Sequence, residues 1–159
     1  CIRNHPSVRG YLPDPSLIPY AAHRAWVQKE LLEGRNLCLF LVREAGQPIG
    51  FALLKRCSPD TLEIGVMIRE ADRHPLVPVY AGALMLYWAF CRLGATWVVS
   101  YPVHPRALAL NQYFGPEEVA SDRPGKIKLR LHRDVGLADP NYRRVFGRIQ
   151  GRMVVEETA

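Results

Sequence analysis

Hydrophobic and polar residues alternate along residues 62–68, and this two-residue period is typical of a β-strand with one buried face. The apolar side chains fall on one side of the strand and Glu63 falls on the other. Residues 79–93 are mostly apolar, which predicts a buried helix. Residues 95–101 are rich in β-branched and aromatic side chains and predict a second strand, and residues 104–115 predict a second helix. Strand, helix and strand in this order predict a βαβ unit.

Other elements are expected on both sides of this unit. Residues 1–15 contain turn-forming residues and predict a loop with at most one helical turn, and apolar residues recur at helical spacing over residues 16–33. A β-hairpin is expected over residues 37–43 and 48–55, because two apolar segments flank a short connection that contains glycine. Residues 126–131 alternate between basic and apolar side chains, which predicts a strand with one exposed face.

The chain has 159 residues, enough for one domain with its own hydrophobic core, and no internal repeat indicates a second. We therefore expect a single domain over residues 1–159. Residues 132–159 extend beyond the last predicted strand, and a helix is expected to begin near Asp139, weakened by Gly147 and Gly151. The four cysteines lack metal-ligand spacing, which predicts reduced thiols, no metal site and a cytoplasmic protein.

The chain is basic, with a formal net charge of +6 and a pI of about 9.4, and much of the excess follows residue 122. Clustered Lys and Arg side chains can bind nucleic-acid phosphates. Here the basic residues alternate with apolar ones or occur singly, and no nucleic-acid motif accompanies them, so polynucleotide binding is not expected. The longest apolar run, residues 81–90, is too short to span a membrane, so no membrane association is expected.

Residues 61–115 resemble the acyl-coenzyme A half of GNAT acyltransferases, of the kind that acetylate ribosomal-protein N-termini or amino groups on nucleotide sugars. In those families an Arg-Asn pair and a Val-Arg pair precede a helix with His-x-x-Trp. This chain has the matching residues Arg3, Asn4, Val8, Arg9, His23 and Trp26. The resemblance covers roughly residues 1–131, and it implies a family strand that would precede residue 1.

The fold that the resemblance implies is of the α/β (α+β) class. Its central sheet is mixed and mostly antiparallel, flanked by helices, and the acyl-coenzyme A cleft lies between two diverging parallel strands. The implied activity is transfer of acetyl from acetyl-coenzyme A to a primary amine of a small molecule or a protein N-terminus. The protein can be a homodimer or not, and the amine that accepts the acetyl group is not identified.

The loop before the apolar helix departs from the family pattern Arg/Gln-x-x-Gly-x-Gly/Ala. The chain keeps Arg73 but has Leu76 and Pro78 where the glycines stand. Such a loop binds pyrophosphate because free backbone N–H groups at a helix N-terminus point at the anion. Leu76 adds a side chain and Pro78 removes a donor. Loss of one hydrogen bond to a charged group costs about 1.5–3 kcal/mol, so coenzyme A binding is expected to weaken about tenfold or more.

The resemblance places the acyl donor on the Glu63 strand, on the loop and on the two helices. The expected cofactor-binding residues are Val66, Met67, Ile68, Arg73, His74, Leu76, Val77, Pro78, Val79, His104 and Asn111. Because the family loop is altered, the alternative function is a non-catalytic GNAT-fold binding module with an impaired pyrophosphate loop.

Two residues are expected to be catalytic, Glu63 and His104. Glu63 is the best candidate base, since a carboxylate beside apolar walls has the raised pKa that the role needs, and the alternative is a solvated or ion-paired sheet residue. His104 can contact the cofactor, transfer a proton or cap the following helix. Asn111 stands at the family's tyrosine position and cannot donate a proton usefully, and Tyr113 lies about 200° round the helix from it. The general acid is therefore not identified, and water can assist thiolate release.

Overall fold

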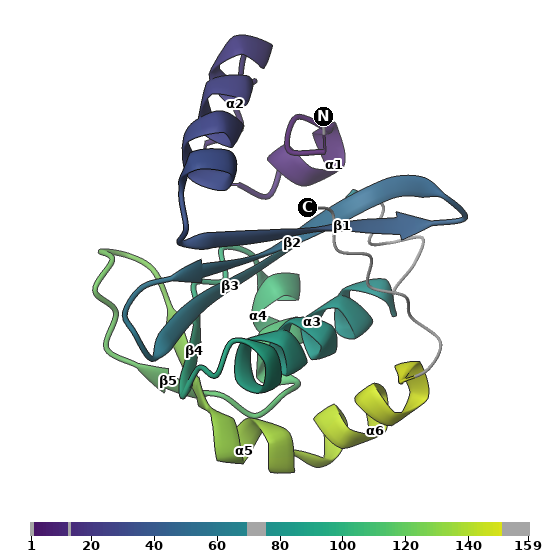
Figure 1. Ribbon diagram of the computed structural model, residues 1–159, viewed down its shortest axis with the longest axis vertical. Coiled ribbons are helices and arrows are strands. Elements are labelled where there is room, and N and C mark those ends of the chain that lie inside the picture. The colour runs from purple at the N-terminus through teal and green to yellow at the C-terminus, as the bar shows by residue number, and fades with distance from the viewer. Residues whose placement is uncertain (1, 13, 70–75, 151–159) are drawn as a thin grey trace.

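The computed structural model describes residues 2–12, 14–69 and 76–150, and these residues form one mixed sheet with helices on both faces (Figure 1). The strands are β1 (Leu37–Glu44), β2 (Gln47–Arg56), β3 (Thr61–Ile68), β4 (Trp97–Ser100), β5 (Glu117–Val119) and β6 (Lys128–His132). The helices are α1 (Pro6–Arg9), α2 (Tyr20–Trp26), η1 (Val27–Glu33), α3 (Val77–Tyr87), η2 (Trp88–Arg92), α4 (Pro105–Gln112), α5 (Arg133–Ala138) and α6 (Pro140–Ile149).

The sheet has the strand order β1-β2-β3-β4-β6-β5. Its pairs are antiparallel except for β3 and β4, which are parallel. The parallel register runs from Thr61 opposite Trp97 to Glu63 opposite Val99 and then ends. Beyond Glu63, β3 continues beside β2 to Ile68, whereas β4 continues beside β6. The predicted mixed, mostly antiparallel sheet with two diverging parallel strands is therefore confirmed.

The hydrophobic core lies between the sheet and the helices α3, η2 and α6, which cover one face of the sheet in Figure 1, while α1 and α2 lie on the other. The apolar side of β3 enters this core as its alternation predicts, and Leu62 is only 2% exposed. Phe90 of η2, Leu131 of β6 and Val145 of α6 are buried in the same cluster. Packing of β3 against η2, β6 and α6 holds the apolar face of β3 in the core. Glu63 lies on the opposite face of the strand.

The helix expected over residues 16–33 begins later, at Tyr20, and this part of the prediction was wrong. Pro19 disfavours a helical conformation in the residue before it. The side chain of Asn4 also bonds both backbone groups of Ile18, donating to its oxygen at 2.8 Å and accepting from its nitrogen at 3.0 Å. The helical spacing after Tyr20 is continued by η1, which ends at Glu33 as predicted.

Two short elements were not predicted, the strand β5 and the helix α5. Neither is long enough to show a periodic pattern of apolar residues. The start of α5 is capped by His132, whose Nδ1 accepts from the backbone nitrogen of Asp134 at 3.2 Å. The helix expected near Asp139 is present as α6, with the carboxylate of Asp139 accepting from the backbone of Tyr142 at 2.9 Å. No helix in the described part of the chain has the length and hydropathy of a membrane span.

The predicted hairpin is formed by β1 and β2, joined by Ala45 and Gly46. Both residues have positive φ, 47° and 78°, as a two-residue type I′ turn requires. Ala45 is the one non-glycine residue with positive φ among the described residues. The left-handed conformation costs a residue with a Cβ about 1–2 kcal/mol, and asparagine tolerates it better than alanine.

The substitution Ala45→Asn is therefore expected to raise the free energy of unfolding by about 0.5–1 kcal/mol, which corresponds to about 2 °C in Tm for a chain of this size. Urea titration measures the first quantity and thermal melting the second. Ala120→Asn, at an exposed position without positive φ, is the control and is expected to leave stability unchanged. An unchanged or lower unfolding midpoint for Ala45→Asn would contradict the turn assignment.

Candidate functional site

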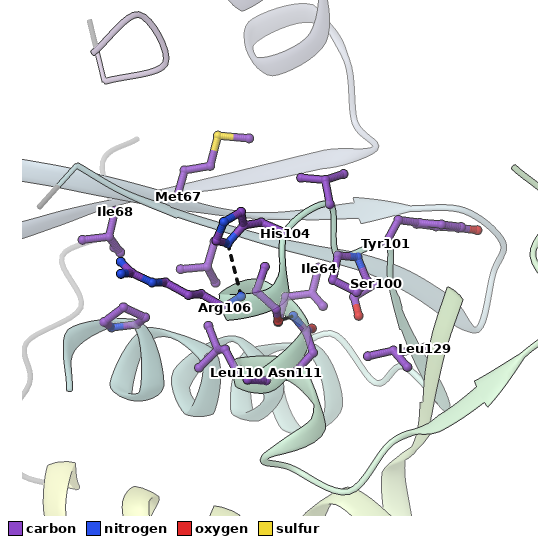
Figure 2. Close-up of a pocket in the computed structure, with 18 of the residues that line it drawn as sticks. Ile64, Met67, Ile68, Ser100, Tyr101, His104, Arg106, Leu110, Asn111 and Leu129 are labelled. Atoms are coloured by element: carbon purple, nitrogen blue, oxygen red, sulfur yellow. Dashed lines mark hydrogen bonds between the residues drawn. The ribbon is translucent and has the colours of Figure 1, made fainter. Parts of the chain in front are cut away.

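A cavity of about 1050 Å³ lies where β3 and β4 diverge (Figure 2). Its walls are the second half of β3, the first turns of α3, the segment between β4 and α4, and α4 itself. Residues that follow α1, among them Tyr11, close it from the other face of the sheet. Pro102 follows β4 closely, and because proline has no backbone N–H it ends the strand where the cavity opens.

The open edge of β3 forms one wall of the cavity, which Val66, Met67 and Ile68 line. Their binding of an acyl donor stays a prediction. On one side these residues pair with β2. On the other side β4 has already diverged, so no described strand pairs with that edge after Glu63. An unpaired strand edge offers N–H and C=O groups to an extended ligand that carries amides.

The start of α3 forms the end of the cavity near the C-terminal end of β3. Pro78 and Val79 line the cavity, whereas Leu76 is the residue before the helix and its side chain is 57% exposed. Val77 begins the helix, and Pro78 occupies its first turn without disturbing it. The first amides of an eleven-residue helix face an anion favourably, with one donor absent at Pro78. Arg73 and His74 lie outside the described residues.

Glu63 lines the cavity where the two strands part, and its carboxylate is bound by Arg123. The guanidinium donates from Nη1 to Oε1 at 3.0 Å and from Nη2 to Oε2 at 2.5 Å. The side chain of Glu63 is 18% exposed and that of Arg123 is 41% exposed. The structure thus has the ion-paired arrangement of Glu63, and its catalytic role stays a prediction.

Arg123 was not among the residues predicted from the sequence. It begins the turn Arg123-Pro-Gly-Lys126 between β5 and β6, in which Gly125 has φ of 68° and the nitrogen of Lys126 donates to the oxygen of Arg123 at 3.2 Å. Pro followed by Gly with positive φ is typical of a type II turn. This dipeptide was a usable signal for the turn, but nothing in the sequence names Glu63 as the partner.

Tyr101 supports the guanidinium of Arg123, which lies 3.6 Å from the ring centroid. The hydroxyl of Tyr101 donates to Asp122 at 2.6 Å, and Lys128 lies 3.1 Å from the same carboxylate. The hydrogen bond from Tyr101 and the charge of Lys128 hold the pKa of Asp122 at about 2. Burial and the bond to Asp122 raise the pKa of Tyr101. Tyr101 therefore keeps its proton at neutral pH and directs it to Asp122.

His104 caps α4, so one of its three possible roles is observed. Its Nδ1 accepts from the backbone nitrogen of Arg106 at 3.2 Å, the dashed contact in Figure 2. Its ring lies 4.3 Å from that of Tyr11, and both residues line the cavity. Asn111 also lines the cavity, with its amide nitrogen donating to the oxygen of Ala107 at 2.6 Å. Tyr113 lines it too, while its hydroxyl accepts from Arg144.

Ser100 is a further residue that the sequence analysis missed. It is the last residue of β4, it is 6% exposed, and it lines the cavity. Figure 2 shows Ser100 among the residues that line the cavity. Within residues 2–12, 14–69 and 76–150 the hydroxyl of Ser100 has no hydrogen-bond partner, so it can serve a ligand in the cavity.

The part of the chain that the structure describes holds no cluster of His, Cys, Asp or Glu that could bind a metal ion. The groups gathered in and around the cavity are instead an open strand edge, a helix N-terminus, an ion-paired carboxylate and the hydroxyl of Ser100. These groups suit a long ligand with amides and a phosphate end, and proton transfer at the end near Glu63.

The overall structure is similar to solved N-acetyltransferases, and the predicted GNAT fold is confirmed. No protein-family model and no curated protein matches the sequence. Spermidine N-acetyltransferase from Vibrio cholerae, solved with CoA and spermine, has a TM-score of 0.71 at 15% identity over 86% of this chain and 90% of its own.

Two other structures have the same fold. The N-acetyltransferase PseH from Campylobacter jejuni, solved with acetyl coenzyme A, has a TM-score of 0.60 at 19% identity, over 72% of this chain and 82% of its own. RimJ from Mycobacterium smegmatis, solved with CoA-disulfide, has a TM-score of 0.65 at 12% identity, over 80% of this chain and 68% of its own. At such identities the similarity establishes the fold, and function has to be argued from the site.

Proposed function

We propose that this protein transfers the acetyl group of acetyl-coenzyme A to a primary amine. The observation that carries the proposal is the cavity between the diverging strands β3 and β4, with an unpaired β3 edge along one wall. The solved N-acetyltransferases that share the fold, from Vibrio cholerae and Campylobacter jejuni, were crystallised with CoA or acetyl coenzyme A.

The residues present fit the acyl donor at both ends of the cavity. The backbone of Val66, Met67 and Ile68 would pair with the amides of the pantetheine arm, and the first amides of α3 would hold the pyrophosphate. Pro78 supplies no donor there, so the site is weaker than one with an intact glycine loop. Binding by Arg73 and His74 remains a prediction, because both lie outside the described residues.

The reaction needs a base for the acceptor and a donor for the departing thiolate. Glu63 would take a proton from the ammonium, after which the amine nitrogen attacks the thioester carbon and the carbon–sulfur bond breaks. The sulfur leaves with the electron pair and takes a proton from water, and the hydroxide formed takes the second proton from the nitrogen, which becomes a neutral amide. The hydroxyl of Ser100 would donate a hydrogen bond to this sulfur, in place of the tyrosine that Asn111 replaces. His104 has Nε2 left for proton transfer, since Nδ1 caps α4.

The alternative is a non-catalytic binding module with the same fold. Pro78 and the amide of Asn111, which is bonded to its own helix, favour it. Such a module would bind a ligand in the cavity without acetylating an amine.

Calorimetric titration with acetyl-coenzyme A, with coenzyme A and with a long-chain acyl-coenzyme A tests the proposal. We expect saturable binding of acetyl-coenzyme A, together with release of free thiol when a primary amine is present. Binding without thiol release for a broad panel of primary amines would favour the non-catalytic module. If no thioester binds even at about millimolar concentration, near −4 kcal/mol, the acyltransferase proposal should be abandoned.

Glu63→Gln keeps the shape of the side chain and removes the base. We expect turnover to fall by roughly 10²–10⁴ while acetyl-coenzyme A affinity stays nearly constant. Glu117→Gln is the matched control, because Glu117 also pairs with an arginine, Arg130, but lies outside the cavity lining. Turnover of Glu63→Gln within a few-fold of the parent would assign Glu63 a structural role only.

Ser100→Ala removes the hydroxyl that would meet the thiolate. One hydrogen bond to a charged group corresponds to about 1.5–3 kcal/mol, so kcat should fall by about 10–100-fold with little change in acetyl-coenzyme A affinity. Ser58→Ala, in an exposed turn, is the control. Ser100→Thr restores the hydroxyl and should recover much of the rate. An unchanged kcat in Ser100→Ala, with a normal melting curve, would rule out the assigned role.

A further inference from the structure

The ion pair between Arg123 and Glu63 is in conflict with a simple role of Glu63 as base. Both carboxylate oxygens accept a hydrogen bond from one guanidinium, at 3.0 Å and 2.5 Å. A guanidinium bound in this bidentate way occupies one lone pair on each carboxylate oxygen, the syn pair, and leaves an incoming ammonium group only the less basic anti pairs. Opening at least one of the two contacts frees a syn lone pair, at which Glu63 is the stronger base.

The contacts of Arg123 would let its guanidinium change its carboxylate partner while it stays in the same position. Its guanidinium stacks on the ring of Tyr101, whose hydroxyl is bonded to Asp122, and Asp122 is paired with Lys128. The side chain of Arg123 is 41% exposed and contacts Glu63, which lines the cavity, although Arg123 itself is not a lining residue. A planar guanidinium held by its face keeps its N–H groups directed at the same point. A carboxylate or a phosphate arriving from solvent can therefore replace Glu63 there.

The charges on the acceptor amine determine how much free energy is needed to open the ion pair of Arg123 and Glu63. An amine with a nearby anionic group places its ammonium on Glu63 and its anion on Arg123, so every charge keeps a partner. A neutral amine leaves Arg123 without a partner at the site. A polyamine brings a second positive charge beside the guanidinium, which is repulsive.

We propose that the acceptor is a primary amine that carries a carboxylate or phosphate group within a few bonds of the nitrogen, and that Arg123 binds this anion and thereby releases Glu63. The inference rests on the proposed acetyl transfer and adds the substrate class of the same site. Arg123 is a specificity-determining residue in this scheme, and its departure from Glu63 couples acceptor binding to activation of the base.

A second ion pair between an arginine and a glutamate, Arg130 with Glu117, provides a control with the same kinds of contact. Arg130 donates from Nε and Nη2 to Glu117 at 2.9 Å and 2.7 Å, and its guanidinium lies 4.4 Å from the ring centroid of Trp97. None of these three residues lines the cavity. A variant of Arg130 thus removes an arginine, an ion pair and an aromatic contact without touching the site.

Four amines with short chains test the proposal: β-alanine, 2-aminoethyl phosphate, 3-aminopropanamide and 1,3-diaminopropane. The kcat/KM of acetylation by the wild-type protein is expected to be about tenfold or more higher for the two anionic amines than for the amide and the diamine. In Arg123→Gln the ratio of β-alanine to 3-aminopropanamide should fall toward one. In Arg130→Gln it should stay at the wild-type value. Comparing this ratio between proteins cancels the intrinsic reactivity of each amine.

A binding measurement keeps the test independent of turnover. Calorimetry of the coenzyme A-saturated protein is expected to give a lower Kd for β-alanine than for 3-aminopropanamide, and Arg123→Gln should remove the difference. If Arg123→Gln fails to fold, Arg123→Lys replaces it, since lysine keeps the charge and loses the bidentate, stacked geometry.

Two results would overturn the inference and leave acetyl transfer intact: equal or better use of the neutral amide or the diamine, or an anion preference that Arg123→Gln does not change. Equal affinity for β-alanine and its amide in the coenzyme A-saturated protein would also overturn it. Absence of acetyl-coenzyme A binding would instead overturn the proposed function, and the inference with it.

Discussion

The site depends on the point at which the parallel pairing of β3 and β4 ends. Thr61 to Glu63 pair with Trp97 to Val99, and after that β3 stays with β2 while β4 stays with β6. Unpaired backbone groups beside a cavity are stabilised only when water or a ligand bonds them, so a strand edge that opens inside a fold favours occupancy by a chain of amides. The same divergence exposes Glu63 and Ser100 to the cavity. One change of strand partner thus creates the wall, the position of the proposed base and the position of the hydroxyl together.

The pair of Arg123 and Glu63 fixes the position of the Glu63 carboxylate in the unliganded site and restrains its chemistry. An ion pair that is partly exposed contributes little to stability, because water screens it and competes for its hydrogen bonds. The same exposure makes the pair inexpensive to open, and the aromatic support from Tyr101 keeps Arg123 in place after it opens. A fully buried pair in this position would hold Glu63 too firmly for catalysis. The partial exposure of Arg123 is therefore what makes an ion-paired carboxylate compatible with service as a base.

The sequence predicts the parts of this structure that depend on local periodicity. Alternation in residues 62–68 identifies β3, and its place before an apolar helix and a β-branched strand identifies the βαβ unit. The contact between Glu63 and Arg123 joins residues 60 positions apart, and no periodic pattern carries such information. Ser100 was missed for a similar reason. In the sequence it is an ordinary residue at the end of a buried strand, and its access to the cavity depends on the divergence of two strands. The late start of α2 at Tyr20 depends on another distant contact, between Asn4 and Ile18.

The altered loop before α3 and the proposed chemistry near Glu63 lie at opposite ends of the site. Ile68 lies five positions after Glu63 along β3, about 16 Å at the usual rise of a strand, and the start of α3 lies at the Ile68 end. Because Pro78 has no backbone N–H, the phosphate end of the donor would be bound less tightly, and by the same amount in the ground state and in the transition state. KM would then rise, and the barrier at the thioester would not change. A weakened phosphate site is therefore compatible with the proposed transfer chemistry, whereas the hydrogen bonds of Glu63, Arg123 and Ser100 would act where that proposal has bonds made and broken. The altered loop by itself decides how tightly the donor is held, and the groups around Glu63 decide whether the protein is an enzyme.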